Sequence, residues 1–133
     1  MNKYGCVAMD AVASCTSKQG MNPVDAWDTA AIKHFGEGTA SQKKGCPKSA
    51  FLGLCSEGYV KGIPSGEYTS SQKNKKYAID AVALLRLEPN LTSDIAVLWK
   101  RVLNGQHKQH NSQMDVVRAL WQGGMLNKLM PPG

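Results

Sequence analysis

The tetrapeptide Asp-Ala-Val-Ala occurs twice in this chain, at residues 10–13 and 80–83. Each copy lies in a segment with helical apolar spacing and is followed by a tryptophan-containing helix, a Ser-Gln pair and a final helix that ends at glycine. Because these features recur in the same order at a period of about 70 residues, they predict a duplicated three-helix unit. We therefore expect two related halves, over residues 1–68 and 72–133.

Capping residues, prolines and glycines predict where the helices of both halves begin and end. In the first half, we expect helices over residues 3–18, 23–35 and 46–57. In the second half, we expect them from Tyr77 to Leu87, from a Thr92 or Ser93 cap to Gly105, and from an Asn111 or Ser112 cap to Gly123. The segment between Gly58 and Tyr68 contains Gly-Ile-Pro-Ser-Gly, which favours a small hairpin or an ordered loop. The predicted fold is mainly α, a single globular domain over residues 1–133.

The apolar faces of these helices predict the core, since a chain of 133 residues can bury roughly two-thirds of its unfolded surface. The predicted core residues are Val12, Trp27, Phe35, Phe51, Leu54, Val82, Leu98, Trp99, Val102, Leu120 and Trp121. The N-terminus shows no export signal, so we expect the four cysteines to be reduced and the protein to be cytoplasmic. No apolar run approaches the roughly 20 residues of a membrane span, so no membrane association is expected.

The net charge of +6 is concentrated in two acid-free stretches, residues 38–48 and 69–76. Their basic residues are Lys43, Lys44, Lys48, Lys73, Lys75 and Lys76. Because both stretches flank the predicted 46–57 helix and the loop after it, a positive field would be strongest there. This distribution suggests one functional hypothesis, which is binding of nucleic acid.

In the nucleic-acid hypothesis, the first three helices and a hairpin carrying Lys61 resemble a winged helix-turn-helix. The 46–57 helix would be the recognition helix, and the lysines would contact phosphates. About ten residues separate Phe35 from that helix, however, where such motifs use a turn of three or four.

A cysteine-based enzyme is a second alternative. Cys46 is expected at a helix N-terminus beside lysines, where the helix dipole favours a thiolate. If the halves pack around a pseudo-twofold axis, His110 and Asn111 would approach it and complete a Cys, His and Asn set. No nucleophile motif surrounds these residues, so the sequence favours a small capping cysteine and a surface histidine.

The sequence favours no metal site and no cofactor. Cys6 and Cys15 are nine residues apart on a helix and so point to opposite faces, as do Cys46 and Cys55. His107 and His110 lie in a polar loop without carboxylates or thiols beside them. The sequence also contains no Gly-rich phosphate-binding motif.

The segments KKGCPKSAFLGLCSEGYVKGIPSGEYT and HNSQMDVVRALWQGGML are similar to a family of small uncharacterised bacterial proteins, in which KGCPKSAFLGLC and HNSQMDVV are the most specific motifs. The resemblance covers essentially the whole chain. It implies a bacterial or mobile-element origin and a cytoplasmic setting, but no activity.

A non-enzymatic binding module is therefore the favoured function, with a protein or peptide partner held by the 41–68 segment and the 106–113 loop beside it. The oligomeric state stays open, and a second copy of the chain is among the partners considered. The candidate binding residues are Lys43, Lys44, Lys48, Tyr59, Lys61, Tyr68, Lys73, Lys75 and Lys76.

Overall fold

The computed structural model describes residues 2–127, which form helices and loops and contain no β-strand. The helices are α1 (Lys3–Thr16), α2 (Pro23–Phe35), α3 (Ala40–Lys43), α4 (Gly45–Ser56), α5 (Gln72–Leu87), the 3₁₀ helix η1 (Pro89–Ser93), α6 (Ile95–Leu103) and α7 (Gln113–Gln122). The predicted mainly α class is confirmed. Residues 128–133, assigned above to the second half, lie outside the described residues.

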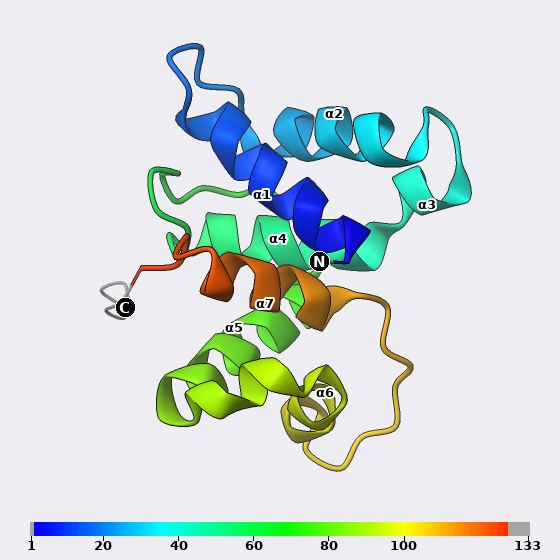
Figure 1. Ribbon diagram of the computed structural model, residues 1–133, viewed down its shortest axis with the longest axis vertical. Coiled ribbons are helices and arrows are strands. Elements are labelled where there is room, and N and C mark those ends of the chain that lie inside the picture. Colours follow the sequence, from blue (N-terminus) through cyan, green and yellow to red (C-terminus); the bar gives the residue numbers. More distant parts are fainter. Residues whose placement is uncertain (1, 128–133) are drawn as a thin grey trace.

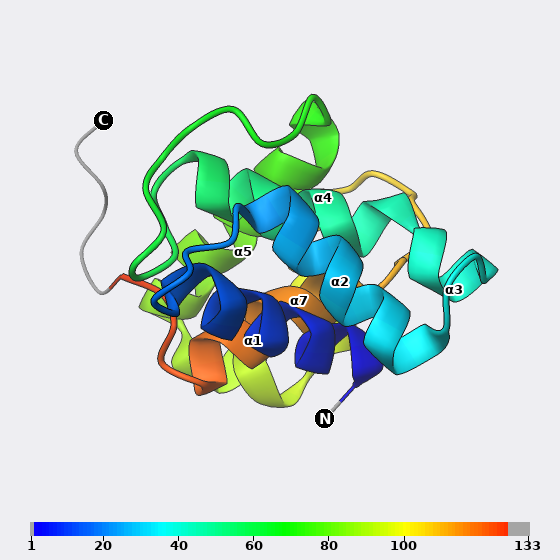
Figure 2. The same ribbon diagram turned by 90° about the horizontal axis from the view of Figure 1, so that it is seen from above.

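The longer helices lie in three layers (Figure 1). Helices α1 and α2 pack against each other in one outer layer, α4 and α7 lie side by side in the middle, and α5 with α6 forms the other outer layer. The short helix α3 connects the ends of α2 and α4 at one side of the molecule (Figure 2). The middle layer is therefore covered on both faces.

The core lies around α4 and α7, where the largest fully buried side chains include Phe51, Leu54, Met114 and Leu120. The Trp27 and Phe51 rings lie 5.3 Å apart between centroids and join α2 to α4. The predicted core is confirmed, except that two of its members are only partly buried against it. These two residues are Phe35 and Trp121.

Several helix ends follow the predicted capping chemistry. The Asn22 side chain accepts a hydrogen bond from the backbone N–H of Asp25, and Pro23 is the first residue of α2. Helix α4 begins at Gly45 after an N-cap at Lys44, so Cys46 is not the capping residue that the sequence predicted, and Pro47 lies third rather than first in the helix. Proline is tolerated there because the first four N–H groups of a helix have no intrahelical partner.

Other helix starts were predicted wrongly. Helix α5 begins at Gln72 rather than Tyr77, because Ser71 caps it by accepting from the N–H of Asn74. Helix α6 is capped by Asp94 rather than Thr92 or Ser93, which lie in η1. Helix α3 was not predicted, since a four-residue segment with three polar residues gives no apolar periodicity.

The ends of α4 and α7 meet in an isolated antiparallel bridge between Val60 and Leu126. The Lys61 N–H donates to the Met125 carbonyl at 2.8 Å, and the Asn127 N–H donates to the Tyr59 carbonyl at 2.9 Å. Every antiparallel bridge has such a reciprocal pair of bonds, so this pairing does not test the duplicated plan, which stays a prediction.

Helices α4 and α5 approach each other most closely at Gly53. A Cβ atom built on Gly53 would lie 2.7 Å from the Lys75 Cα, which is closer than van der Waals contact allows. The absence of a side chain at this position therefore lets the middle layer pack directly against α5.

We predict that Gly53→Ala destabilises the protein by about 1–3 kcal/mol, because α5 must move away to relieve the clash. Chemical denaturation followed by far-UV circular dichroism will measure the loss. Gly45→Ala is the matched control, since a Cβ there meets nothing within 4 Å, and it should change stability by less than about 0.5 kcal/mol. A Gly53→Ala variant as stable as the wild type would contradict the close-packing argument.

Candidate functional site

The segment after α4 is an ordered loop rather than a hairpin. Its backbone is fixed to the end of α4, where the Gly66 N–H donates to the Ser56 carbonyl and the Tyr68 N–H donates to the Ser56 Oγ. The Tyr68 hydroxyl donates to the Pro64 carbonyl at 2.7 Å, and Ile63 is buried. Tyr68 thus holds the loop together and is half-buried.

The other predicted aromatic contact, Tyr59, is also part of the interior. Only 6% of Tyr59 is exposed, and the Arg86 guanidinium lies 5.5 Å from its ring centroid. Its ring is therefore inaccessible to a partner in the folded protein. Tyr59 thus offers no exposed ring, while the half-buried Tyr68 bonds to the backbone of its own loop, and the binding role predicted for the 41–68 segment stays a prediction.

Most of the predicted basic residues are engaged with neighbouring side chains. Lys48 pairs with Asp28 at 2.8 Å, and Lys75 pairs with Glu57. The remaining contacts are those of Lys76 with Asp80 at 2.5 Å and of the Lys44 Nζ with the Tyr4 ring at 5.5 Å from its centroid. Within residues 2–127, the exposed side chains of Lys43, Lys61 and Lys73 make no ion pair.

His110 and Asn111 hold the start of α7. The His110 Nε2 accepts a hydrogen bond from the Met114 N–H at 3.0 Å, so Nδ1 carries the proton of the neutral ring. The Asn111 N–H donates to the Gln113 side chain at 2.7 Å. The Nε2 lone pair is therefore occupied by a backbone group, which leaves it unavailable to accept a proton from a Cys46 thiol in this geometry.

Burial lowers the pKa of His110 below its ordinary value. Asp115 raises it and Lys44 lowers it, both by smaller amounts. The start of α4 and the loop before α7 lie on the same side of the molecule (Figure 1). Cys46 is half-buried there, and all four cysteines are free thiols.

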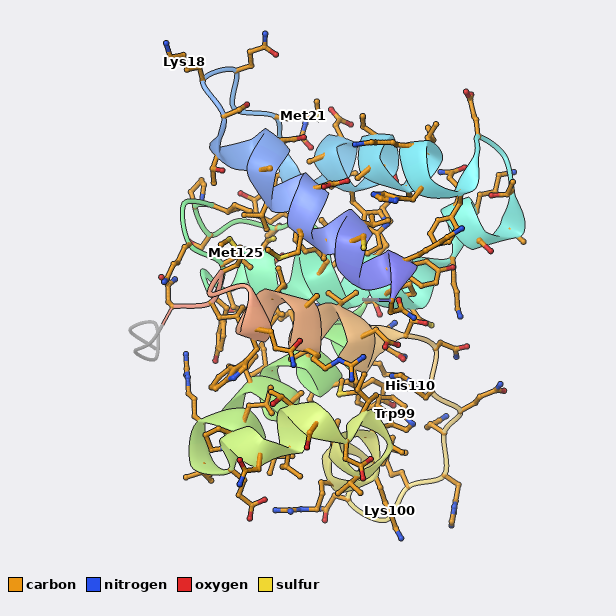
Figure 3. All side chains as sticks on the ribbon, viewed as in Figure 1. Lys18, Met21, Trp99, Lys100, His110 and Met125 are labelled. Carbon is orange, nitrogen blue, oxygen red and sulfur yellow. The ribbon has the colours of Figure 1, made fainter. Side chains whose placement is uncertain are left out.

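A groove lies between α6 and the loop that follows it, with a volume of about 1020 Å³. Trp99 and Leu103 contribute to its lining from the mostly buried face of α6, while Val97 is 41% exposed. Lys100 and Lys108 lie on its rim, and both are exposed. In Figure 3 the Lys100 side chain projects outward from α6, away from the body of the protein.

The loop that forms one wall of this groove is anchored at several points. The Trp99 Nε1 donates to the Lys108 carbonyl at 3.0 Å, and the Trp99 ring lies 5.2 Å from the His110 ring between centroids (Figure 3). The buried Gln113 donates to the Asn74 side chain at 3.1 Å, which ties the start of α7 to α5. These contacts hold the loop wall of the groove against α6.

Sequence reasoning identified one wall of this groove, the 106–113 loop, but missed the other. The apolar stripe of α6 explained Leu98 and Trp99, whereas Val97 lies off that stripe. An exposed valine beside a lysine in a short amphipathic helix was the signal that could have identified this wall.

Two further properties concern residues 2–127 only. No helix there is both long and apolar enough to cross a membrane. No group of three or more histidine, cysteine or acidic residues there is arranged to hold a metal ion.

Comparison with known proteins identifies one family. The model of a family of unknown function, DUF6979, matches residues 1–127. No curated protein and no solved structure matches the chain.

We predict that His110 makes the stability of the protein depend on pH. Because its pKa is lower in the folded than in the unfolded state, protonation favours unfolding, and stability should fall as the pH drops below the unfolded value of about 6.5. His110→Gln should flatten this dependence between pH 7 and 5, measured by denaturation at each pH. The exposed His107→Gln variant is the control and should keep the wild-type slope, whereas equal slopes in all three proteins would contradict the prediction.

We predict that the four cysteines differ in the rate at which they react with a thiol reagent. Burial raises the pKa of Cys55 and of Cys15, so both should react slowly with iodoacetamide in the native protein and normally in denaturant. Mass spectrometry of tryptic peptides will measure each rate at neutral pH. Rapid native labelling of Cys55 would contradict its burial, and labelling of Cys46 faster than a model thiol would support the cysteine-enzyme hypothesis.

Proposed function

The chain belongs to the family of unknown function DUF6979, and we propose from its own geometry that it is a non-enzymatic binding module for a protein partner. The partner is bound as a peptide segment in the groove between α6 and the loop over residues 104–109, which we call the α6 groove. We place this role in the bacterial cytoplasm, and the four free thiols support a reducing compartment.

The single observation that carries the proposal is the combination of volume and lining in the α6 groove. A volume of about 1020 Å³ is larger than a single side chain needs and suits a short peptide segment. Val97 is 41% exposed and lines the groove, as does the more buried Leu103, so an apolar side chain of a partner would find an aliphatic contact at Val97. Burial of apolar surface against such a contact is a common source of affinity in peptide grooves.

The position of the site differs from the one that the sequence favoured. In the 41–68 segment, Tyr59 is buried and Tyr68 holds the loop, so both act within the fold. The 106–113 loop, also expected from the sequence to belong to the functional surface, forms part of the α6 groove. We therefore transfer the proposed binding role from the first half of the chain to this groove.

We predict that peptides selected from a random display library on the immobilised wild-type protein will bind in the α6 groove. Replacing Val97 by Ser removes the exposed aliphatic contact and should weaken binding of the selected peptides about 5- to 10-fold, since full burial of such a side chain contributes about 1.5–3 kcal/mol and Val97 starts partly exposed. Fluorescence anisotropy with labelled peptides will measure the dissociation constants.

Ile32→Ser is the matched control, because Ile32 is 37% exposed on α2 and lies outside the groove. It should leave binding unchanged. Peptides that bind Val97→Ser and the wild type equally would contradict the site, and a failure to enrich any peptide would contradict the peptide-binding role. Salt-sensitive binding of DNA or RNA in place of peptides would return the nucleic-acid hypothesis to first place.

A further inference from the structure

The α6 groove borders a second groove between α5 and α6, with a volume of about 550 Å³. The two share the residues at the end of α6 and the following turn, namely Arg101, Leu103, Asn104 and Gln106. The second groove adds the start of α5, with Lys73, Lys76 and Tyr77. A segment lying in both would thus run from the 106–109 loop across the end of α6 to α5.

The charges along this joined surface are almost all positive. Its basic residues are Lys73, Lys76, Lys100, Arg101 and Lys108, and its acidic lining residue is Asp80. Lys76 is paired with Asp80, and Arg101 is paired with Glu88 at 2.8 Å.

Within residues 2–127, three lysines of this surface make no ion pair, and all three are exposed. They are Lys73 on α5, Lys100 on α6 and Lys108 in the loop. Each element that lines the joined grooves therefore contributes one uncompensated positive charge. A ligand crossing all three elements would meet positive charge along its whole length.

We propose that the partner segment is acidic, with an apolar anchor side chain held at Val97 and carboxylates placed toward Lys100, Lys108 and Lys73. This inference rests on the proposed binding function and specifies its ligand. Charge complementarity selects the sign of the segment, since a basic segment would bring like charges together. The aliphatic contact favours a peptide as the ligand, because the exposed hydrophobic side chain that lines the α6 groove is Val97.

A nucleic acid would complement the positive charge of the lysines, but the lining of the α6 groove offers little surface on which bases could stack. Single-stranded nucleic acids bind by stacking bases on exposed aromatic rings, in addition to their phosphate contacts. Trp99 is only 7% exposed, and its ring packs against the His110 and Tyr77 rings. Of the ring side chains that line the joined grooves, the exposed His107 is the smallest, and the exposed hydrophobic residue, Val97, is aliphatic and offers no face for stacking. An acidic peptide therefore fits both parts of the surface.

The test is a selection from the random peptide library, with the charge of the enriched peptides as the first readout. We expect an excess of Asp and Glu over Lys and Arg in peptides enriched on the wild type. A double variant, Lys100→Gln with Lys108→Gln, should bind these peptides about 3- to 10-fold more weakly, as expected for two exposed charge pairs. The loss should shrink as salt rises from 50 to 500 mM, because salt screens such pairs.

The matched control is Lys43→Gln with Lys61→Gln, which removes the same charge from the 41–68 segment. It should leave the dissociation constants unchanged, and weaker binding there would overturn the site. Enriched peptides that are neutral or basic but still depend on Val97 would overturn the acidic ligand while leaving the proposed function standing. No Val97-dependent peptide would overturn both, and binding of oligonucleotides but not peptides would replace them with the nucleic-acid hypothesis.

Discussion

Helix α4 is buried from Pro47 to Ser56 apart from Lys48 and Ser49, and the rest of the chain is arranged around this fact. A helix that is apolar on most sides needs neighbours on most sides, and α2, α5 and α7 supply them. The contact with α5 is the closest because Gly53 has no side chain. This close approach fixes the position of the start of α5. It thereby also fixes Lys73 and Lys76, which line the groove between α5 and α6.

Polar contacts then determine the conformation of the loops, which the packing of the core alone does not fix. The Trp99 indole binds a loop carbonyl, and the buried Gln113 joins α7 to α5. Every buried side-chain polar atom among residues 2–127 has a hydrogen-bond partner. The wall of the α6 groove is therefore held by a small set of satisfied bonds rather than by apolar packing.

The sequence was sufficient for features that depend on local chemistry. Asn22 and Pro23 predicted the start of α2, and apolar periodicity predicted most of the core. Sequence patterns gave wrong predictions where the deciding contact joins residues distant in sequence, or where the element is very short. The lysines after Ser71 looked like a loop because their charge hides the helical pattern, and the tyrosines looked exposed because their partners, Arg86 and Pro64, could not be inferred from sequence spacing. The groove was only half predicted, since the exposed Val97 on its α6 wall lies off the apolar stripe of the helix.

The layered arrangement also bears on how the chain folds. Helix α1 packs against α7, at the other end of the described chain, and α5 packs most closely against α4. The first helix of each predicted half thus lies on the last helix of the other half. A nascent N-terminal half would leave one face of α1 uncovered until α7 had been synthesised. The contact between α1 and α7 therefore joins segments far apart in sequence, and such contacts slow folding relative to local ones.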